Sequence, residues 1–127
     1  MGVKAIAVLT AGGDAPGMNA AVRAVVRSAL ALGMRAHGVR RAYKGLVSGE
    51  IAELGARDVG GIIQRGGTVL QTARFPEFAK PEVQQEALRQ LKAHGIDALV
   101  AIGGDGTMRG AAALQRLGFP VVGIPAS

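Results

Sequence analysis

The sequence has no cysteine and no tryptophan, and its aromatic residues are limited to one tyrosine and three phenylalanines. The lack of cysteine excludes disulfides, thiolate metal ligands and a cysteine nucleophile. The scarcity of aromatic rings leaves little for the stacking platforms of proteins that bind single-stranded nucleic acid. No apolar run is long enough to cross a bilayer, and the first four residues show no cleavable signal. We therefore expect a cytoplasmic protein without a membrane partner.

Basic residues are in modest excess, because 15 lysines and arginines outnumber 9 acidic residues and give a formal charge of +6. They are spread along the chain, and no nucleic-acid-binding module is recognisable. This distribution favours small phosphate-bearing ligands over nucleic acid as partners. A chain of 127 residues is long enough for one modest core, so we expect a single domain over residues 1–127.

Apolar runs alternate with helical patterns along most of the chain. The apolar runs predict strands at residues 5–9, 35–39, 97–102 and 120–124, and the helical patterns begin at Met18, Pro81 and Met108. Alternation of this kind predicts an α/β fold with a doubly wound, mostly parallel sheet in a Rossmann-like three-layer arrangement. The signals between residues 40 and 80 are weaker: they suggest loops at 43–46 and 73–78 and a short helix at 58–64.

Two glycine-rich turns follow apolar strands and precede helices: Gly12-Gly13-Asp14 and Gly103-Gly104-Asp105-Gly106. Neither fits the Walker pattern or the dinucleotide-binding Gly-x-Gly-x-x-Gly pattern. Glycines let backbone amides approach phosphate oxygens closely, and a carboxylate beside them suits Mg²⁺. Since the carboxyl ends of parallel strands share one edge, we expect both turns to form one magnesium–nucleotide site.

Three arginines are candidates for binding anions. Arg74, in a predicted loop, has the charge that phosphoryl transfer requires, although a surface arginine explains it equally well. Arg23 and Arg27, four residues apart on the first helix, are interpreted from the sequence alone as a solvated face, with a clamp for phosphate as the alternative. We assign no role to His37 and interpret His94 as a surface residue that compensates a helix dipole.

Residues 10–20, Thr-Ala-Gly-Gly-Asp-Ala-Pro-Gly-Met-Asn-Ala, resemble the N-terminal signature of bacterial ATP-dependent 6-phosphofructokinases. Segments 65–68, 73–78, 95–100 and 102–107 match the same family in order and spacing. The resemblance extends along the whole chain but covers only the first part of a family polypeptide of roughly 320 residues. It implies a kinase of glycolysis, a transferase that moves the γ-phosphate of ATP to the 1-hydroxyl of fructose 6-phosphate. The chain is then the first part of the ATP-binding domain.

The resemblance also implies roles for individual residues. Gly13 and residues 104–107 (Gly104, Asp105, Gly106 and Thr107) bind the ATP phosphates, and Asp105 lies on the Mg²⁺ side. Arg74 and Phe75 border the nucleotide, with Arg74 stabilising charge, and Tyr43 aligns with a tyrosine near it. Relatives that use pyrophosphate usually carry Asp where this chain has Gly106 and lysine where it has Ala126, so both residues point to ATP.

Regulation and assembly follow from the same resemblance. Arg23 and Arg27 match positions that bind the phosphates of an allosteric effector, ADP or phosphoenolpyruvate, across a subunit interface, and the family implies a homotetramer. Ala56 and Gly61 depart from the arginine and aspartate that usually complete this site. Arg57 and Asp58 lie close by in the sequence.

The family's general base is not among these 127 residues. In the family the last strand is followed by Pro-Gly-Thr-Ile-Asp-Asn-Asp, whose first Asp is that base, whereas this chain has Pro125-Ala126-Ser127. Ser127 keeps a hydroxyl where the family has a substrate-contacting threonine. We therefore expect an incomplete nucleotide-binding domain that is inactive as a sugar kinase on its own.

Two other functions compete with this interpretation. Kinases of NAD and of diacylglycerol share Gly-Gly-Asp-Gly-Thr but lack the Gly-Gly-Asp-Ala-Pro-Gly-Met-Asn opening. A non-catalytic nucleotide-binding fragment is the third possibility, and the missing base supports it.

Overall fold

One mixed sheet organises the part of the chain that the computed structural model describes, residues 2–11, 17–60 and 70–126. Its strand order is β3-β2-β1-β4-β5. Four strands are parallel to their neighbours, and β3 runs antiparallel to β2 at one edge. The strands are β1 (Ala5–Thr10), β2 (Arg35–Val39), β3 (Ile51–Leu54), β4 (Ala98–Gly103) and β5 (Val121–Pro125). The predicted α/β class with a mostly parallel sheet is confirmed.

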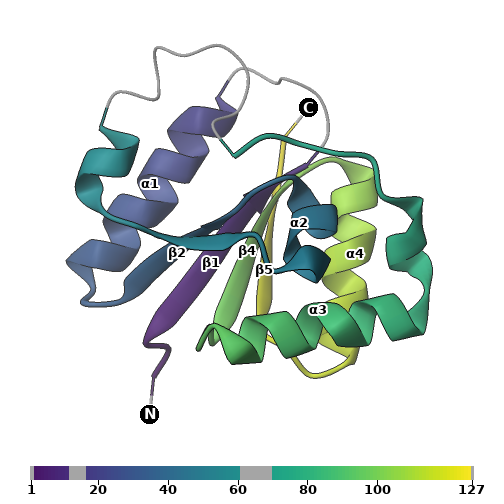
Figure 1. The fold of residues 1–127 in the computed structure, drawn as a ribbon. Coiled ribbons are helices and arrows are strands. Elements are labelled where there is room, and N and C mark those ends of the chain that lie inside the picture. Colours follow the sequence, from purple (N-terminus) through teal and green to yellow (C-terminus); the bar gives the residue numbers. More distant parts are fainter. Residues whose placement is uncertain (1, 12–16, 61–69, 127) are drawn as a thin grey trace.

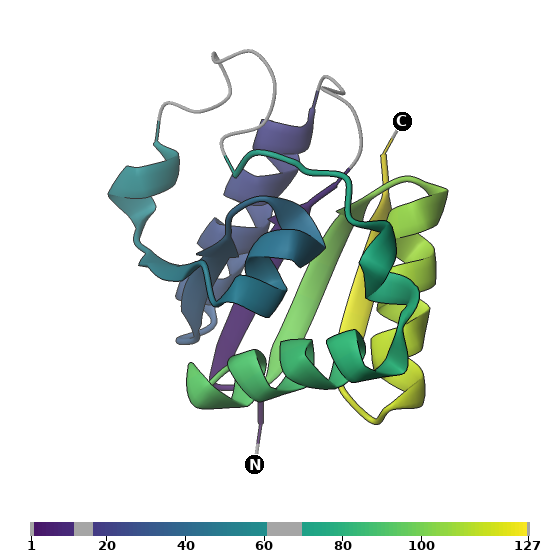
Figure 2. The ribbon, with the colours of Figure 1, turned by 45° about the vertical axis from the view of Figure 1, so that its right-hand side comes forward.

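The central strand β1 is buried on both faces, as the strands of doubly covered parallel sheets are. Ile6 and Val8 point to one face, where they pack with Val22 and Val26 of helix α1 (Met18–Ala31). Ala7 and Leu9 point to the other face, which α2 (Ala42–Ser48), α3 (Pro81–Ala93) and α4 (Asp105–Arg116) cover. Figure 1 shows the resulting three layers, and the turned view in Figure 2 shows α3 crossing below α2 and α4.

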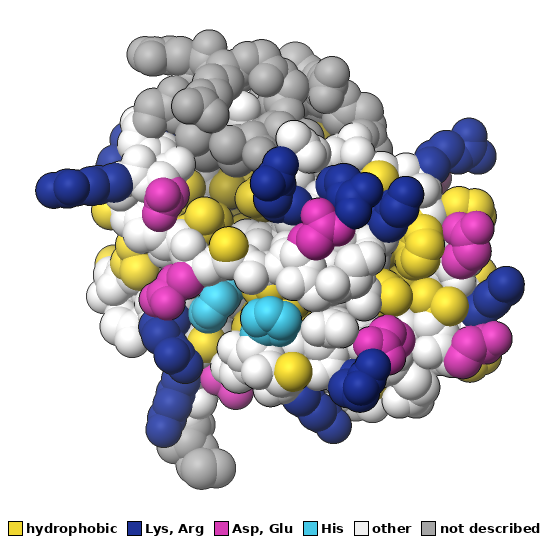
Figure 3. All heavy atoms as spheres, viewed as in Figure 1, with side chains coloured by type: hydrophobic (Ala, Val, Ile, Leu, Met, Phe, Trp, Pro, Cys, Tyr) yellow, Lys and Arg dark blue, Asp and Glu magenta, His cyan; other side chains and the backbone are white. Residues whose placement is uncertain are grey.

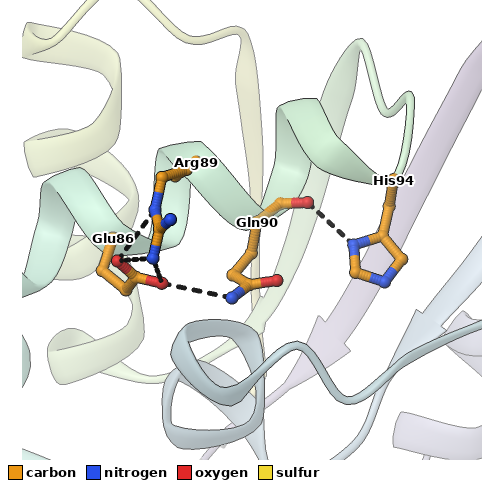
Figure 4. A network of polar contacts seen from close by, with 4 residues as sticks. All are labelled: Glu86, Arg89, Gln90 and His94. Carbon is orange, nitrogen blue, oxygen red and sulfur yellow. Dashed lines mark hydrogen bonds and ion pairs between the residues drawn. The ribbon is translucent and has the colours of Figure 1, made fainter.

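Helix α3 follows its sequence signals closely. Pro81 opens it, and Ala87, Leu88 and Leu91 are its buried stripe. Figure 4 shows polar side chains along another face, where Glu86 accepts hydrogen bonds from Arg89 and Gln90. His94 is exposed, and its Nδ1 lies 2.8 Å from the carbonyl oxygen of Gln90 in the last turn. The predicted surface position of His94 is confirmed.

Several local predictions are wrong. Residues 43–46 lie in helix α2 rather than a loop, because burial of Tyr43 and Leu46 against the sheet outweighs the weak local helix signal. Strand β3 was not anticipated. Helix α4 begins at Asp105, three residues before the predicted Met108, since Gly104 takes the cap position.

In the described parts of residues 55–80, the structure has two short 3₁₀ helices where the sequence predicted a helix at 58–64 and a loop at 73–78. The first, η1 (Ala56–Val59), covers the start of the helix predicted at 58–64, and residues 61–64 lie outside the described residues. The second, η3 (Pro76–Ala79), lies within the predicted loop. Among the described helices, none combines the length and the apolar content that crossing a bilayer requires.

Candidate functional site

The carboxyl ends of β1 and β4 lie side by side at one edge of the sheet. Thr10 pairs with Ile102 in the register of the two strands, and the amide of Ala11 donates a 2.9 Å hydrogen bond to the carbonyl oxygen of Ile102. The segments that follow these strands therefore start from the same edge, as expected for the carboxyl ends of parallel strands. Residues 12–16 of the first glycine turn lie outside the described residues, whereas the second turn is described in full.

The second turn leads directly into the N-terminus of α4. The first bond of the helix runs from the amide of Met108 to the carbonyl oxygen of Gly104, at 3.0 Å. The amides of residues 105–107 precede that bond and point along the helix axis, as the first amides of any α-helix do. A Cβ built on Gly104 would meet nothing within 4 Å. Among the described residues, the space beside Gly104 at the start of the helix is thus open.

Gly103 lets the strand and the helix approach each other. A Cβ at this position would lie 2.2 Å from the carbonyl oxygen of Ala11 and 2.4 Å from Oγ1 of Thr107. Both distances are far below van der Waals contact, so any side chain here would separate β1 from α4. The Thr107 hydroxyl is buried beside the same carbonyl oxygen, at 3.5 Å. Glycine at position 103 is therefore required by packing.

A cavity of about 760 Å³ opens at this place, a size typical of small-molecule sites. It is lined by residues from α2, α4 and the segment before α3. Of the residues that the sequence singled out for nucleotide binding, it brings together Tyr43, Arg74, Phe75, Gly104, Asp105, Gly106 and Thr107. They come from three separate parts of the chain, which only the fold places side by side.

Tyr43 forms a wall of the cavity and is held from three sides. Its hydroxyl donates a 2.7 Å hydrogen bond to the carbonyl oxygen of Thr107, and its ring stacks on Phe78 with centroids 4.2 Å apart. The ring also lies against Gly110, where a Cβ would approach Cε2 to 2.6 Å. Burial raises the pKa of the Tyr43 hydroxyl well above its usual value of 10.0. The phenol is thus a neutral donor at physiological pH.

The backbone corner before Tyr43 is strained. Arg41 and Ala42 both adopt left-handed φ angles, 60° and 55°, a conformation unfavourable for residues other than glycine. Arg41 forms a two-pronged ion pair with Glu50, whose hydrogen bonds lower the pKa of the Glu50 carboxyl below its usual value. The amide of Arg41 also donates a 3.0 Å bond to the carbonyl oxygen of Leu70. The corner therefore links Tyr43 to the segment that leads to Arg74.

The segment from Ala73 to Ala79 also lines the cavity, next to Tyr43. Its 3₁₀ turn is anchored to α3 by Gln84, whose side-chain amide donates a 2.9 Å bond to the carbonyl oxygen of Phe78. Phe78 is buried and Phe75 is partly buried against the same core. Arg74 is exposed at the cavity. Its predicted contact with the nucleotide and its role in stabilising charge stay predictions.

The charges around the cavity are mostly positive. Arg74, Arg109 and Arg116 line it, against the single carboxylate of Asp105. In the described ranges the recorded ion pairs are Arg41 with Glu50 and Arg89 with Glu86, so neither Asp105 nor these three arginines is paired there. Figure 3 shows basic and acidic side chains interspersed on the face of the molecule that is seen in Figure 1. The electrostatic balance of the cavity favours an anionic ligand.

Other predicted site residues lie elsewhere. Arg23 and Arg27 are on α1, on the opposite face of the sheet. Arg27 is exposed, while Nε of Arg23 is buried without a hydrogen-bond partner among the described residues. Ala56 begins η1. Gly13, Gly61 and Ser127 lie outside the described residues.

Sequence reasoning missed Arg109, Gly110 and Phe78 as residues of the cavity. A signal for the first two was present: once α4 starts at Asp105, helical spacing places Arg109 one turn after Asp105 and Gly110 one turn after Gly106. Phe78 had no comparable signal, because its position depends on how the segment before α3 folds back.

Comparisons with known proteins agree with this arrangement. A model of the phosphofructokinase family matches residues 5–127. The ATP-dependent 6-phosphofructokinase of Streptococcus suis is 58% identical over 123 residues, which are 97% of this chain and 37% of that protein. The enzyme of the same name from Streptococcus pyogenes is also 58% identical, over 36% of its length. The chain thus spans a little over a third of the length of these curated relatives.

Solved structures show the same fold. The phosphofructokinase of Pichia pastoris in the T-state superposes with a TM-score of 0.92 at 38% identity, covering 100% of this chain and 15% of that one. The phosphofructokinase of Saccharomyces cerevisiae gives 0.88 at 39% identity, covering 98% of this chain and 20% of that one. A pyrophosphate-dependent phosphofructokinase from Marinobacter aquaeolei, at 17% identity and a TM-score of 0.79, shares the fold over 96% of this chain and 32% of its own.

Proposed function

The chain belongs to the phosphofructokinase family, and on that premise we propose that it carries the nucleotide-binding part of an ATP-dependent 6-phosphofructokinase. The proposed reaction moves the γ-phosphate of ATP to the 1-hydroxyl of fructose 6-phosphate and yields fructose 1,6-bisphosphate and ADP. The hydroxyl oxygen bonds to phosphorus as the bond to the ADP oxygen breaks, and a base outside these 127 residues takes the proton. The part of this chain in the reaction is to bind and orient ATP.

One observation supports the proposal above the others: residues from three segments, each marked by the sequence as nucleotide-binding, line a single cavity at the start of α4. The amides of residues 105–107 and the open space at Gly104 suit phosphate oxygens. Arg74 is placed to stabilise the charge that spreads over the γ-phosphate during transfer. Tyr43 and Phe75 supply an apolar wall.

Asp105 fits a magnesium ion that arrives with the nucleotide. Its carboxylate is exposed at the cavity, and the described residues contain no cluster of three or more candidate metal ligands. Mg²⁺ commonly binds through one or two carboxylates together with substrate phosphates, so a single carboxylate here is sufficient. The ion, when bound, neutralises phosphate charge. Asp105 would hold this ion at the N-terminus of α4.

Calorimetry with Mg-ATP on the 127-residue chain tests the binding role. We expect binding, and we expect Asp105→Asn to weaken it about tenfold or more, because a charged ligand to the metal is lost. Glu82→Gln is the matched control, since Glu82 is also an acidic residue in the first turn of a helix but lies outside the cavity. Equal affinities for the unchanged chain, Asp105→Asn and Glu82→Gln would contradict the proposed site.

A hybrid enzyme tests the reaction itself. In it, this chain replaces the 123 matching residues of the Streptococcus suis relative, which supplies the remainder of the polypeptide. We expect ATP-dependent phosphorylation of fructose 6-phosphate, and none of NAD. Arg74→Ala in the hybrid should lower kcat about a hundredfold while changing the affinity for ATP far less. Equal losses in kcat and in ATP affinity would mean that Arg74 binds ATP in the ground state and does not specifically stabilise the transition state.

Regulation and assembly are further parts of the proposal. We propose that Arg23 and Arg27 bind the phosphate of ADP or phosphoenolpyruvate and that the enzyme is a homotetramer. The buried, unpartnered Nε of Arg23 supports an anion there, within the described residues. In the hybrid, Arg23→Ala should abolish the effect of either effector on the saturation curve for fructose 6-phosphate while leaving Mg-ATP affinity unchanged.

A further inference from the structure

Arg109 lies in the second turn of α4, and its guanidinium is folded back over the first turn. Its Nη2 atom is 3.6 Å from the position that a Cβ on Gly106 would occupy. This direction agrees with the general lean of helical side chains toward the N-terminus of their helix. The positive charge of Arg109 is therefore placed beside the open amides of residues 105–107.

The guanidinium of Arg109 is not engaged in an ion pair. Asp105 is four residues earlier on the same helix, a spacing at which opposite charges commonly pair. Among the described residues, however, neither Asp105 nor Arg109 forms an ion pair. Arg109 is exposed and lines the cavity beside Gly104 and Gly106. Within the described residues, the Arg109 guanidinium is therefore available to a ligand in the cavity.

We propose that Arg109 binds the phosphate chain of the nucleotide, as a second guanidinium in addition to Arg74. The proposal rests on the proposed function, because it assumes a nucleotide in this cavity. A planar guanidinium binds phosphate oxygens through two parallel hydrogen bonds, and its charge adds to the positive end of the α4 dipole. A Cβ on Gly106 would be in ordinary van der Waals contact with the guanidinium, so the Arg109 charge lies directly beside the first turn of α4.

Arg116 provides a control within the same cavity. It also lines the cavity but lies seven residues further along α4, which is about 10 Å along the helix axis. It is thus remote from the amides of the first turn. If the contact of Arg109 is with phosphate, then the loss of Arg116 has a much smaller effect than the loss of Arg109.

The test compares Arg109→Met, Arg109→Lys and Arg116→Met in the 127-residue chain, by calorimetry with Mg-ATP and with magnesium tripolyphosphate. Arg109→Met should weaken both ligands about tenfold, because one charge-assisted contact is lost, and Arg109→Lys should do so less. Arg116→Met should change either affinity by no more than about twofold. The salt dependence of Mg-ATP binding should also become shallower in Arg109→Met, because fewer ions are exchanged on binding.

Four outcomes would overturn the proposal. Unchanged affinities in Arg109→Met would show that the residue does not contact the ligand. A loss for Mg-ATP without a loss for tripolyphosphate would assign the contact to the nucleoside. Absence of any Mg-ATP binding to the unchanged chain would end the proposed function as well. Binding that Asp105→Asn weakens and Arg109→Met does not would refute the role of Arg109 alone. If Arg109→Met fails to fold, Arg109→Gln gives the same comparison.

Discussion

At the scale of single residues, Tyr43 combines a buried hydroxyl, a stacked ring and a position on the wall of the cavity. It is also the one tyrosine of a chain without tryptophan. Its ultraviolet absorbance therefore reports the ionisation of a single known group. Few proteins allow the protonation of one wall residue of a candidate site to be measured so directly.

We predict that the Tyr43 phenol does not ionise as the pH passes 10.0, the usual pKa, because burial raises its pKa in the folded chain. The stability that the neutral phenol provides is complete below pH 10 and is lost as the pH rises through the folded pKa. Phenolate absorbance should therefore appear above pH 10 in the native chain and near 10 in denaturant. Tyr43→Phe should reduce the alkaline loss of stability. A native midpoint near 10 would contradict the burial of this hydroxyl.

We predict that Gly110→Ala destabilises the fold by about 1–3 kcal/mol, because the added Cβ would overlap the ring of Tyr43. The same substitution in a Tyr43→Val background should be neutral or stabilise by up to about 1 kcal/mol, since alanine is the better helix former. Urea unfolding of the unchanged chain, the two single variants and the double variant gives the coupling energy between positions 43 and 110. Additive effects would show that the ring and Gly110 are not in contact.

At the scale of elements, the Asp97 carboxylate connects the starts of two neighbouring strands. One carboxylate oxygen of Asp97 accepts hydrogen bonds from the amides of Lys4 and Ala5, at 2.9 and 3.0 Å. The amide of Asp97 in turn donates to the carbonyl oxygen of Ala5. Asp97 thus fixes the start of β1 against the start of β4. These two hydrogen bonds, of which the one from Lys4 has the larger effect, lower the pKa of the Asp97 carboxyl below its usual value.

We predict that Asp97→Asn lowers the melting temperature at neutral pH and has less effect in acid. A lowered folded pKa means that the contribution of the carboxylate is present above the usual pKa of 3.8 and is lost as the pH falls through the folded value. The melting temperatures of Asp97→Asn and of the unchanged chain should therefore converge below about pH 3.8. Glu53→Gln, at an exposed position of β3, is the control. A difference that stays constant with pH would contradict the role of the charge.

At the scale of the whole molecule, the described helices on the α1 face leave part of β5 uncovered. Helix α1 and η1 cover β1 and β2, whereas β5 lies at the edge, paired with β4 within the described residues. Val122 and Ile124 point to the α1 face, and Val122 is 59% exposed. An unpaired strand edge beside exposed apolar side chains favours association between chains.

We predict that the 127-residue chain self-associates with rising concentration and that Val122→Lys reduces this association. The substitution places a charge on the edge strand at an exposed position, so its cost in stability should be below about 0.5 kcal/mol. Leu32→Lys is the control, because Leu32 is 75% exposed but lies after α1, away from β5. Sedimentation velocity measures the effect. Equal association of both variants and the unchanged chain would exclude β5 as the contact.

The amino-acid sequence by itself determined the parallel core strands, the apolar stripe of α3 and the motif residues of the candidate site. These features depend on local periodicity, on glycine and proline chemistry and on motifs whose residues are neighbours in the chain. Only the tertiary structure decided that residues 43–46 are helical, that β3 forms an antiparallel edge, and that Tyr43 stacks on Phe78. The physical reason is that these features are selected by contacts between segments far apart in sequence, whose burial outweighs weak local preference.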